Sequence, residues 1–176
     1  GYKIDLDGYS SLQAYKLDVI SKKSRYKFKT YAKKIDSLVN ISSKVYYGNI
    51  DDETYEFVFS HFKTLLRKRF FSKKTNNNNL SSQEWAFYKD VTLPMIRNKE
   101  AALFVTYDEN RPIAINLVNF SDTTMYDVIR VFDIDYAKYR LGAVGIMKQI
   151  EWCINNKFDV LDFSKGYFDY KKRWSN

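Results

Sequence analysis

The chain has 176 residues, with 29 Lys and Arg against 21 Asp and Glu, so its formal net charge is +8. Its one Cys and one His exclude an internal disulfide and leave too few ligands for a Cys/His zinc site. No stretch reaches the roughly 18 to 20 apolar residues of a membrane span, and the N-terminus lacks the features of a signal peptide. We therefore expect a soluble cytoplasmic protein without a metal site.

Helical periodicity dominates the first half of the chain. Apolar side chains at helical spacing predict helices over 10–20, 22–38, 54–71 and 81–98, and a short strand is predicted over 43–48. The helix over 54–71 is expected to end in the basic cluster Arg67-Lys68-Arg69. The helix over 22–38 has one basic face, formed by Lys22, Lys23, Arg25, Lys27, Lys29, Lys33 and Lys34. A solvated surface is the simplest interpretation of this face, and contact with a phosphate-bearing acceptor or a nucleic acid is the alternative.

The period changes to that of strands after residue 100. Short turns predict an antiparallel meander of three strands, over 101–107, 111–120 and 124–132. A helix over 142–156 and a strand over 158–163 follow, and this crossover makes the last two strands parallel. The fold class expected is α+β, with a mixed sheet and helices on both faces. The strand over 158–163 is expected at the edge of the sheet, with further strands beyond Asn176.

Two glycines mark the start of the helix over 142–156. Gly142 and Gly145 would let a ligand approach the backbone closely, and the first N–H groups of a helix favour an anion such as phosphate. Spacing alone favours the simpler interpretation, in which the glycines only let the helix pack closely on the sheet. A P-loop is excluded because no Gly is followed by Lys and then Ser or Thr.

A second informative segment runs from the last predicted strand into the C-terminal tail. Asp162 lies within a strand of buried character, and a buried carboxylate needs partners. Tyr170 and Lys171 follow closely. An ion pair that ties the tail to the sheet is the simplest interpretation of this arrangement.

Four segments are similar to motifs of one enzyme superfamily. They are Ile4-Asp5-Leu6 with Tyr15, Leu17 and Ser21-Lys22-Lys23-Ser24-Arg25; Phe132-Asp133 with Gly142; Ile150-Glu151-Trp152; and Asp162-Phe163-Ser164-Lys165-Gly166 with Tyr170-Lys171 and Trp174. They resemble the GNAT acyltransferases, in the branch related to cellulose-biosynthesis acyltransferases and Fem-type peptidyltransferases. The resemblance spans nearly the whole chain, and the segment from Asp162 is its most specific part.

The resemblance implies that acetyl-CoA or another acyl-CoA is the donor. It implies that backbone N–H groups near the start of the helix over 142–156 hold the pyrophosphate, and that the pantetheine arm follows the strand over 124–132 into a gap beside the strand over 158–163. The cofactor-binding residues implied are Val131, Tyr139, Arg140, Leu141, Gly142, Ala143, Val144 and Gly145. The family pattern has Gln or Arg at position 139 and Gly or Ala at position 144, so Tyr139 and Val144 depart from it.

Acyl transfer to an amine needs a base for the ammonium proton and a donor to the oxyanion. A carboxylate base suits a chain with one His, and the candidates are Asp133 and Asp162. Tyr170 and Lys171 are candidates for the acid or for a substrate contact. The simpler interpretations are a turn cap for Asp133 and packing for Tyr170. The single histidine, His61, and the single cysteine, Cys153, fall on apolar faces and are expected to be packed there.

We therefore predict an acyltransferase that acts on a small-molecule amine, such as a nucleotide-linked amino sugar in envelope polysaccharide synthesis. One alternative is a Fem-type transferase that takes aminoacyl-tRNA, with the basic helices over 22–34 and 63–74 contacting the RNA. Another is a non-catalytic GNAT-like binding module. We divide the chain into a helical segment with the basic helix, over 1–40, and a GNAT-like domain over 41–176 that is incomplete at its C-terminus, with further polypeptide after Asn176.

Overall fold

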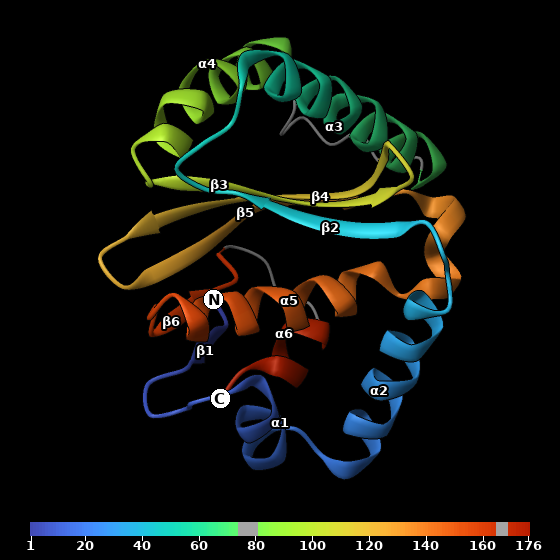
Figure 1. Cartoon of the computed structure of the whole chain (residues 1–176), viewed down its shortest axis with the longest axis vertical. Helices are drawn as coiled ribbons and strands as arrows, with labels where there is room; N and C mark the ends of the chain where they lie inside the picture. The colour runs from blue at the N-terminus through green and yellow to red at the C-terminus, as the bar shows by residue number, and fades with distance from the viewer. Residues whose placement is uncertain (74–80, 165–168) are drawn as a thin grey trace. The chain divides into compact units, whose positions relative to one another are not determined.

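The structure is a computed structural model that describes residues 1–73, 81–164 and 169–176 (Figure 1). One sheet joins six strands in the order β1-β6-β5-β4-β3-β2, and it is antiparallel except for the pair of β5 with β6. The strands are β1 (Lys3–Asp5), β2 (Ile41–Tyr46), β3 (Ala101–Asp108), β4 (Arg111–Ser121), β5 (Thr124–Phe132) and β6 (Val160–Asp162). The predicted α+β class, the meander and the parallel pair are confirmed.

Among the residues that the structure describes, six α-helices and a 3-10 helix accompany the strands. They are α1 (Leu12–Val19), α2 (Lys22–Asp36), α3 (Asp52–Lys73), α4 (Ser82–Arg97), η2 (Ile134–Tyr139), α5 (Leu141–Asn155) and α6 (Asp169–Trp174). Serine side chains cap three of them, because the hydroxyls of Ser11, Ser21 and Ser81 accept hydrogen bonds from backbone N–H groups in the first turns of α1, α2 and α4. The α3 helix continues past the predicted end to Lys73.

The chain forms two compact units, of which the first comprises 1–39, 118–128 and 139–176. In this unit Trp174 of α6 is buried and stacks on Phe28 of α2, with 4.2 Å between ring centroids. The hydroxyl of Tyr15 in α1 donates to the carbonyl of Trp174. On α5, Cys153 is fully buried as expected, and its sulfur lies 3.8 Å from that of Met125 in β5.

The second unit comprises 40–117 and 129–138. Its helices α3 and α4 lie together over one face of β2 and β3 (Figure 1). Phe59, Phe62 and Trp85 form an aromatic cluster between the two helices, with centroid separations of 5.3 to 5.8 Å. This cluster follows directly from the apolar helical spacing of the sequence.

The prediction that the last strand lies at the sheet edge is wrong. β6 pairs on one side with β5 and on the other with β1, where Lys3 opposes Asp162. The strand is also shorter than predicted, since it covers Val160–Asp162. A three-residue strand such as β1 carries no periodic signal, and its partner lies more than 150 residues later in the chain.

The C-terminal residue fastens this edge. Asn176 Oδ1 accepts a hydrogen bond from the N–H of Asp5 at 2.6 Å, and its Nδ2 donates to the carbonyl of Asp5 at 2.9 Å. Two further boundaries differ from prediction: β2 begins at Ile41 rather than at residue 43, and η2 occupies the connection to α5. In the described ranges, no helix combines the length and the apolar composition needed to cross a membrane.

Candidate active site

The predicted donor turn lies in the first unit, at the start of α5. Arg140 precedes the helix with a left-handed backbone (φ 53°, ψ 49°), and no side chain caps the helix there. The first α-helical hydrogen bond runs from Val144 N–H to the Arg140 carbonyl at 3.1 Å. The backbone N–H groups before Val144 therefore belong to the helix terminus, where the dipole favours an anion.

Side chains of this turn divide between the interior and the surface. Leu141 and Val144 are buried, with 4% and 6% of their surface exposed, whereas Gly142, Ala143 and Gly145 stay partly exposed. The departure from the family pattern at Val144 thus places an isopropyl group in the interior. The Val144 side chain therefore leaves the backbone of Gly142 and Gly145 partly exposed.

Two cation–π contacts hold positive charge at the same turn. The Lys34 ammonium lies 5.9 Å from the centroid of the Tyr139 ring, and the Arg140 guanidinium lies 5.8 Å from that of Tyr31. Lys34 and Tyr31 both belong to α2. The first turn of α5 contains no acidic residue, so the cations and the helix dipole act together to favour an anion.

Val131, the residue implied for the pantetheine path, lies in the second unit with its side chain 1% exposed. Val131 would therefore contact a pantetheine arm through its backbone groups. In the described part of the chain, the ladder of β5 with β6 covers residues 124–126 against 160–162. The ladder thus ends at the pair Tyr126 and Asp162, where the resemblance implies a gap between the two strands.

Asp133 lies in the second unit, directly after β5, and is 2% exposed. Its Oδ1 accepts hydrogen bonds from Lys68 Nζ at 2.7 Å and from the N–H of Asp135 at 3.0 Å. Its Oδ2 accepts from Arg111 at 3.0 Å. The Arg111 guanidinium also donates to the Tyr136 hydroxyl at 3.0 Å. Asp133 thus fastens the end of β5 to α3 and to the start of β4.

These contacts control the protonation of Asp133. Burial raises the pKa of its carboxyl, but hydrogen bonds from Lys68, the Asp135 N–H and Arg111 outweigh burial and lower the pKa below its usual value. The hydrogen bonds that Lys68 donates to the carboxylates of Asp133 and Asp135 raise the pKa of its ammonium group. A carboxylate that is already bound by two cations is a weak base. The geometry favours a positioning role for Asp133 over proton abstraction.

The remaining catalytic candidates belong to the first unit. Asp162 is half-buried at the end of β6, and its Oδ1 accepts a hydrogen bond from the Ser164 N–H at 2.8 Å. Lys171 is 4% exposed, and its Nζ donates to the Phe163 carbonyl at 2.9 Å. This contact anchors α6 to the end of β6. The backbone of Tyr170 lies in α6, and its side chain lies outside the described part of the structure.

Several of these polar residues could not be assigned from the sequence. Lys68 belongs to a basic cluster that we attributed to a helix C-terminus, but it pairs with a carboxylate 65 residues later. Lys34 is predicted to lie on a solvated face of the helix over 22–38, and no individual role is predicted for Tyr31. The sequence does carry one signal for this contact. Tyr31 and Lys34 are three positions apart, so they lie on the same face of the basic helix, and that face contacts the turn before α5.

The sequence matches one family model, described as an acetyltransferase (GNAT) domain, over residues 22–172. The chain belongs to this family. The match covers most of the chain, including the basic helix and the segment from Asp162 to Lys171. This is the superfamily that the resemblance implied. Comparison with curated proteins gave no match.

Solved structures share the GNAT fold with this chain. FemX superposes with a TM-score of 0.69 at 9% identity, covering 98% of this chain and 57% of FemX. L-PGS from Bacillus licheniformis superposes with a TM-score of 0.58 at 12% identity, covering 95% of this chain and 47% of that protein. At these identities the similarity shows the fold. The chain spans about half the length of these structures.

Proposed function

We propose that this GNAT domain transfers an acyl group, acetyl in the first instance, from acyl-CoA to an amine. The observation that carries the proposal is the start of α5, where Arg140 and Lys34 lie over aromatic rings and the first turn has no acidic residue. Phosphate groups of CoA match this combination of two cations with the N-terminal end of a helix. Gly142 and Gly145 would let the diphosphate approach the backbone closely.

In this reaction the amine nitrogen attacks the thioester carbonyl, a C–N bond forms, and the C–S bond breaks as the thiolate of CoA leaves. A base must take one proton from the amine. We assign this role to Asp162, which lies where the ladder of β5 with β6 ends. Asp133 is less suited to it, because its carboxylate already binds Lys68 and Arg111. Lys171 is less suited to substrate contact, because it is buried on the Phe163 carbonyl.

The acceptor we propose is a small-molecule amine, such as a nucleotide-linked amino sugar used in envelope polysaccharide synthesis, and the site of action is the cytoplasm. Exposed lysines on α2 support an acceptor that carries phosphates, since ammonium groups attract phosphate oxygens. The match to an acetyltransferase (GNAT) domain supports an amine as the acceptor.

Isothermal titration with acetyl-CoA tests the donor. The proposal predicts saturable binding at submillimolar to millimolar concentration, together with an increase in melting temperature as the ligand is added. If neither heat nor a thermal shift appears at millimolar acetyl-CoA in a folded sample, acyl-CoA is not the donor.

A second candidate, aminoacyl-tRNA as the donor, is favoured by the surface of α2. The only acidic residue of this helix is Asp36, at its C-terminal end. Six of its lysines are exposed: Lys22, Lys23, Lys27, Lys29, Lys33 and Lys34. A strip of this kind suits a polyanion longer than CoA. Binding of tRNA would then weaken steeply with salt, whereas acetyl-CoA contacts few cations and would respond weakly. The two donors are distinguished by measuring both affinities against salt concentration.

A further inference from the structure

The exposed lysines of α2 form a basic face, and the acyl-CoA site proposed above uses only Lys34 among them. The lysines of this face are Lys22, Lys23, Lys27, Lys29, Lys33 and Lys34. Three pairs of like charge stand four positions apart on the helix: Lys23 and Lys27, Arg25 and Lys29, and Lys29 and Lys33. Such pairs destabilise an isolated helix. A charge pattern that costs helix stability favours a partner of the opposite charge.

The basic face continues onto the end of α1. Burial and the nearby positive charges of Arg25 and Lys29 lower the pKa of the Lys16 ammonium group in α1. Nη1 of Arg25 donates to the carbonyls of Lys16 and Leu17, each at 3.4 Å, and to the carbonyl of Ile20. The guanidinium of Arg25 is therefore occupied by the end of α1, and it fixes the corner between the two helices.

Two exposed apolar side chains accompany the cations of this corner. Leu17 is 58% exposed and Tyr26 is 75% exposed. Tyr26 lies four positions after Lys22 and three before Lys29, so these three side chains share one side of α2. A helix with lysines around exposed apolar and aromatic groups has the pattern of one that lies in the interface of a membrane. Tyrosine in particular suits the level of the lipid headgroups.

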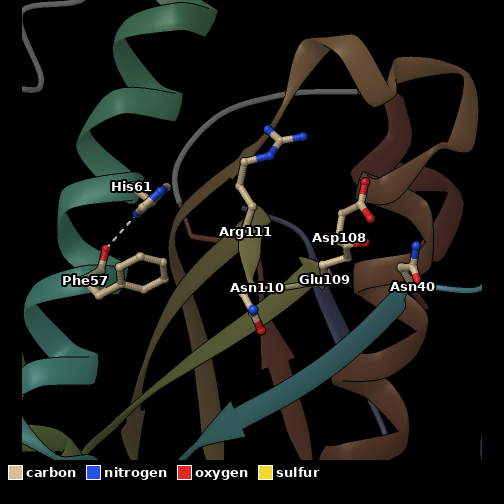
Figure 2. Close-up of a pocket in the computed structure, with 7 residues that line it drawn as sticks. All are labelled: Asn40, Phe57, His61, Asp108, Glu109, Asn110 and Arg111. Atoms are coloured by element: carbon tan, nitrogen blue, oxygen red, sulfur yellow. Dashed lines mark hydrogen bonds between the residues drawn. The ribbon is translucent and has the colours of Figure 1, made fainter.

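A pocket on the second unit has a different charge pattern. It has a volume of about 630 Å³ and lies between α3 and the hairpin of β3 and β4 (Figure 2). The acids Asp108 and Glu109 line it, and the guanidinium of Arg111 in its wall is bound by Asp133 at 3.0 Å. Figure 2 shows Phe57 of α3 facing the hairpin that carries these acids. An anionic surface would be repelled here, so Phe57, which is 43% exposed, is a control for Tyr26.

We propose that the corner of α1 and α2 docks the protein on the surface of a membrane that contains anionic lipids. The lysines of the basic face attract the phosphates of the lipid headgroups. Leu17 and Tyr26 enter the boundary between headgroups and acyl chains, where their apolar surface leaves water. This docking does not depend on the acyl donor and goes beyond the proposed function.

Two observations favour a lipid surface over a nucleic acid as the anionic partner. The basic face consists of lysines, and the one arginine of α2 is bound to α1, whereas recognition of nucleic acids favours a free guanidinium. The side chain of Leu17 offers a nucleic acid no stacking or hydrogen-bonding group. In a bilayer the same side chain is shielded from water.

The test is co-sedimentation of the full chain with two kinds of vesicle, phosphatidylcholine alone and phosphatidylcholine mixed with one third phosphatidylglycerol. We expect saturable binding to the anionic vesicles, at least about tenfold tighter than to the neutral ones. This binding should weaken as salt is added. Equal binding to the two kinds of vesicle, or sedimentation with neither, overturns the proposal.

Variants locate the binding. Lys22→Gln with Lys29→Gln removes the two charges beside Tyr26 and is expected to weaken binding to anionic vesicles about tenfold or more. Lys157→Gln with Lys172→Gln makes the same change in net charge at exposed positions outside α2, and it should bind like the wild type. If the two double variants bind the vesicles equally, the proposal is wrong.

The apolar part of the surface has its own pair of variants. Tyr26→Ser removes an exposed ring from the basic face, and we expect it to weaken binding to anionic vesicles about fivefold. Phe57→Ser removes an exposed ring beside the acids of the pocket in Figure 2 and should leave binding unchanged. Equal binding by these two variants contradicts insertion of Tyr26 into the interface and overturns the proposal.

Titration with tRNA and with acetyl-CoA separates this inference from the two proposed donors. If tRNA binds and the anionic vesicles do not, the face is a nucleic-acid surface and the docking proposal is overturned. If both bind, Leu17→Ser should weaken vesicle binding and leave the affinity for tRNA unchanged, and equal effects on the two overturn the proposal. Failure of acetyl-CoA to bind contradicts the proposed function alone, because vesicle binding is measured without it.

Discussion

The ammonium of Lys68 lies 2.7 Å from Oδ1 of Asp133, which is 2% exposed. The same ammonium lies 2.7 Å from Oδ2 of Asp135, whose side chain is 70% exposed. One cation therefore joins a buried carboxylate to an exposed one. The two acids share Lys68, but Asp133 is also bound by Arg111, so comparing them measures a buried network of ion pairs against one exposed ion pair.

We expect Asp133→Asn to lower the free energy of unfolding by about 2 kcal/mol, because it leaves Lys68 and Arg111 without their shared buried charge. Asp135→Asn removes an exposed partner and should cost no more than about 0.5 kcal/mol. Urea unfolding of both variants measures the difference. Equal losses would show that Asp133 does not hold the end of β5 through its charge.

The contribution of Asp133 should also depend on pH. Its pKa is lower in the folded protein than its usual value, so the stabilisation is present above the unfolded pKa, near 4, and is lost as the pH falls through the folded pKa. The gap in melting temperature between the wild type and Asp133→Asn should be full at pH 6 and should shrink below about pH 4. A gap that stays constant down to pH 2 would contradict this account.

Substitution of Lys171 tests whether this residue anchors α6 or takes part in catalysis. Lys171→Met removes the bond from Nζ to the Phe163 carbonyl, and we expect a loss of about 1 to 3 kcal/mol in stability. Lys172→Met, at the exposed neighbouring position, should be within about 0.5 kcal/mol of the wild type. If Lys171→Met is as stable as Lys172→Met but has lost turnover, Lys171 is catalytic and the anchoring role assigned to it fails.

Much of the fold follows from local periodicity. The aromatic spacing of α3 and α4 and the short turns of the meander are contained in contiguous segments, and those elements are predicted within a few residues. By contrast, β1 is a three-residue strand that finds its partner at the other end of the chain. Its formation depends on tertiary pairing, which no local pattern records.

The candidate site, too, has a part that the sequence predicts and a part that depends on tertiary contacts. The glycines of α5 and the acids Asp133 and Asp162 are visible as residues in a sequence, but their partners are not. Whether Asp133 is a base or a bound anion depends on Lys68, which lies 65 residues away. The resemblance drew attention to Lys171 as a catalytic candidate, whereas its burial on the Phe163 carbonyl appears only in three dimensions.

Asp162→Asn tests the proposed base. Asparagine keeps an oxygen for the hydrogen bond from the Ser164 N–H, so the fold should persist, while kcat should fall about 10²-fold to 10⁴-fold. Turnover is followed as amine-dependent release of the CoA thiol. Asp159→Asn makes the same change in charge just before β6 and should retain activity. If both variants turn over at the wild-type rate, the base is another group.

Paired substitutions on α2 separate the two proposed donors. Lys29→Gln with Lys33→Gln removes two exposed charges from the basic face. If tRNA is the donor, the slope of log affinity against log salt should fall by about 1.4 to 1.8. If acyl-CoA is the donor, its affinity should change less than about twofold. Lys157→Gln with Lys172→Gln, which lie outside α2, controls for net charge.

The affinity of acetyl-CoA for Arg140→Gln, compared with Lys157→Gln, tests the central claim most directly. Both are exposed cations with left-handed backbones, φ 53° before α5 and φ 61° after it, so they differ in which end of the helix they occupy. We predict that Arg140→Gln weakens binding about tenfold, the loss of one charged phosphate contact, and that Lys157→Gln binds like the wild type. Equal affinities in the two variants, or no binding by the wild type, would contradict an acyl-CoA site at the start of α5.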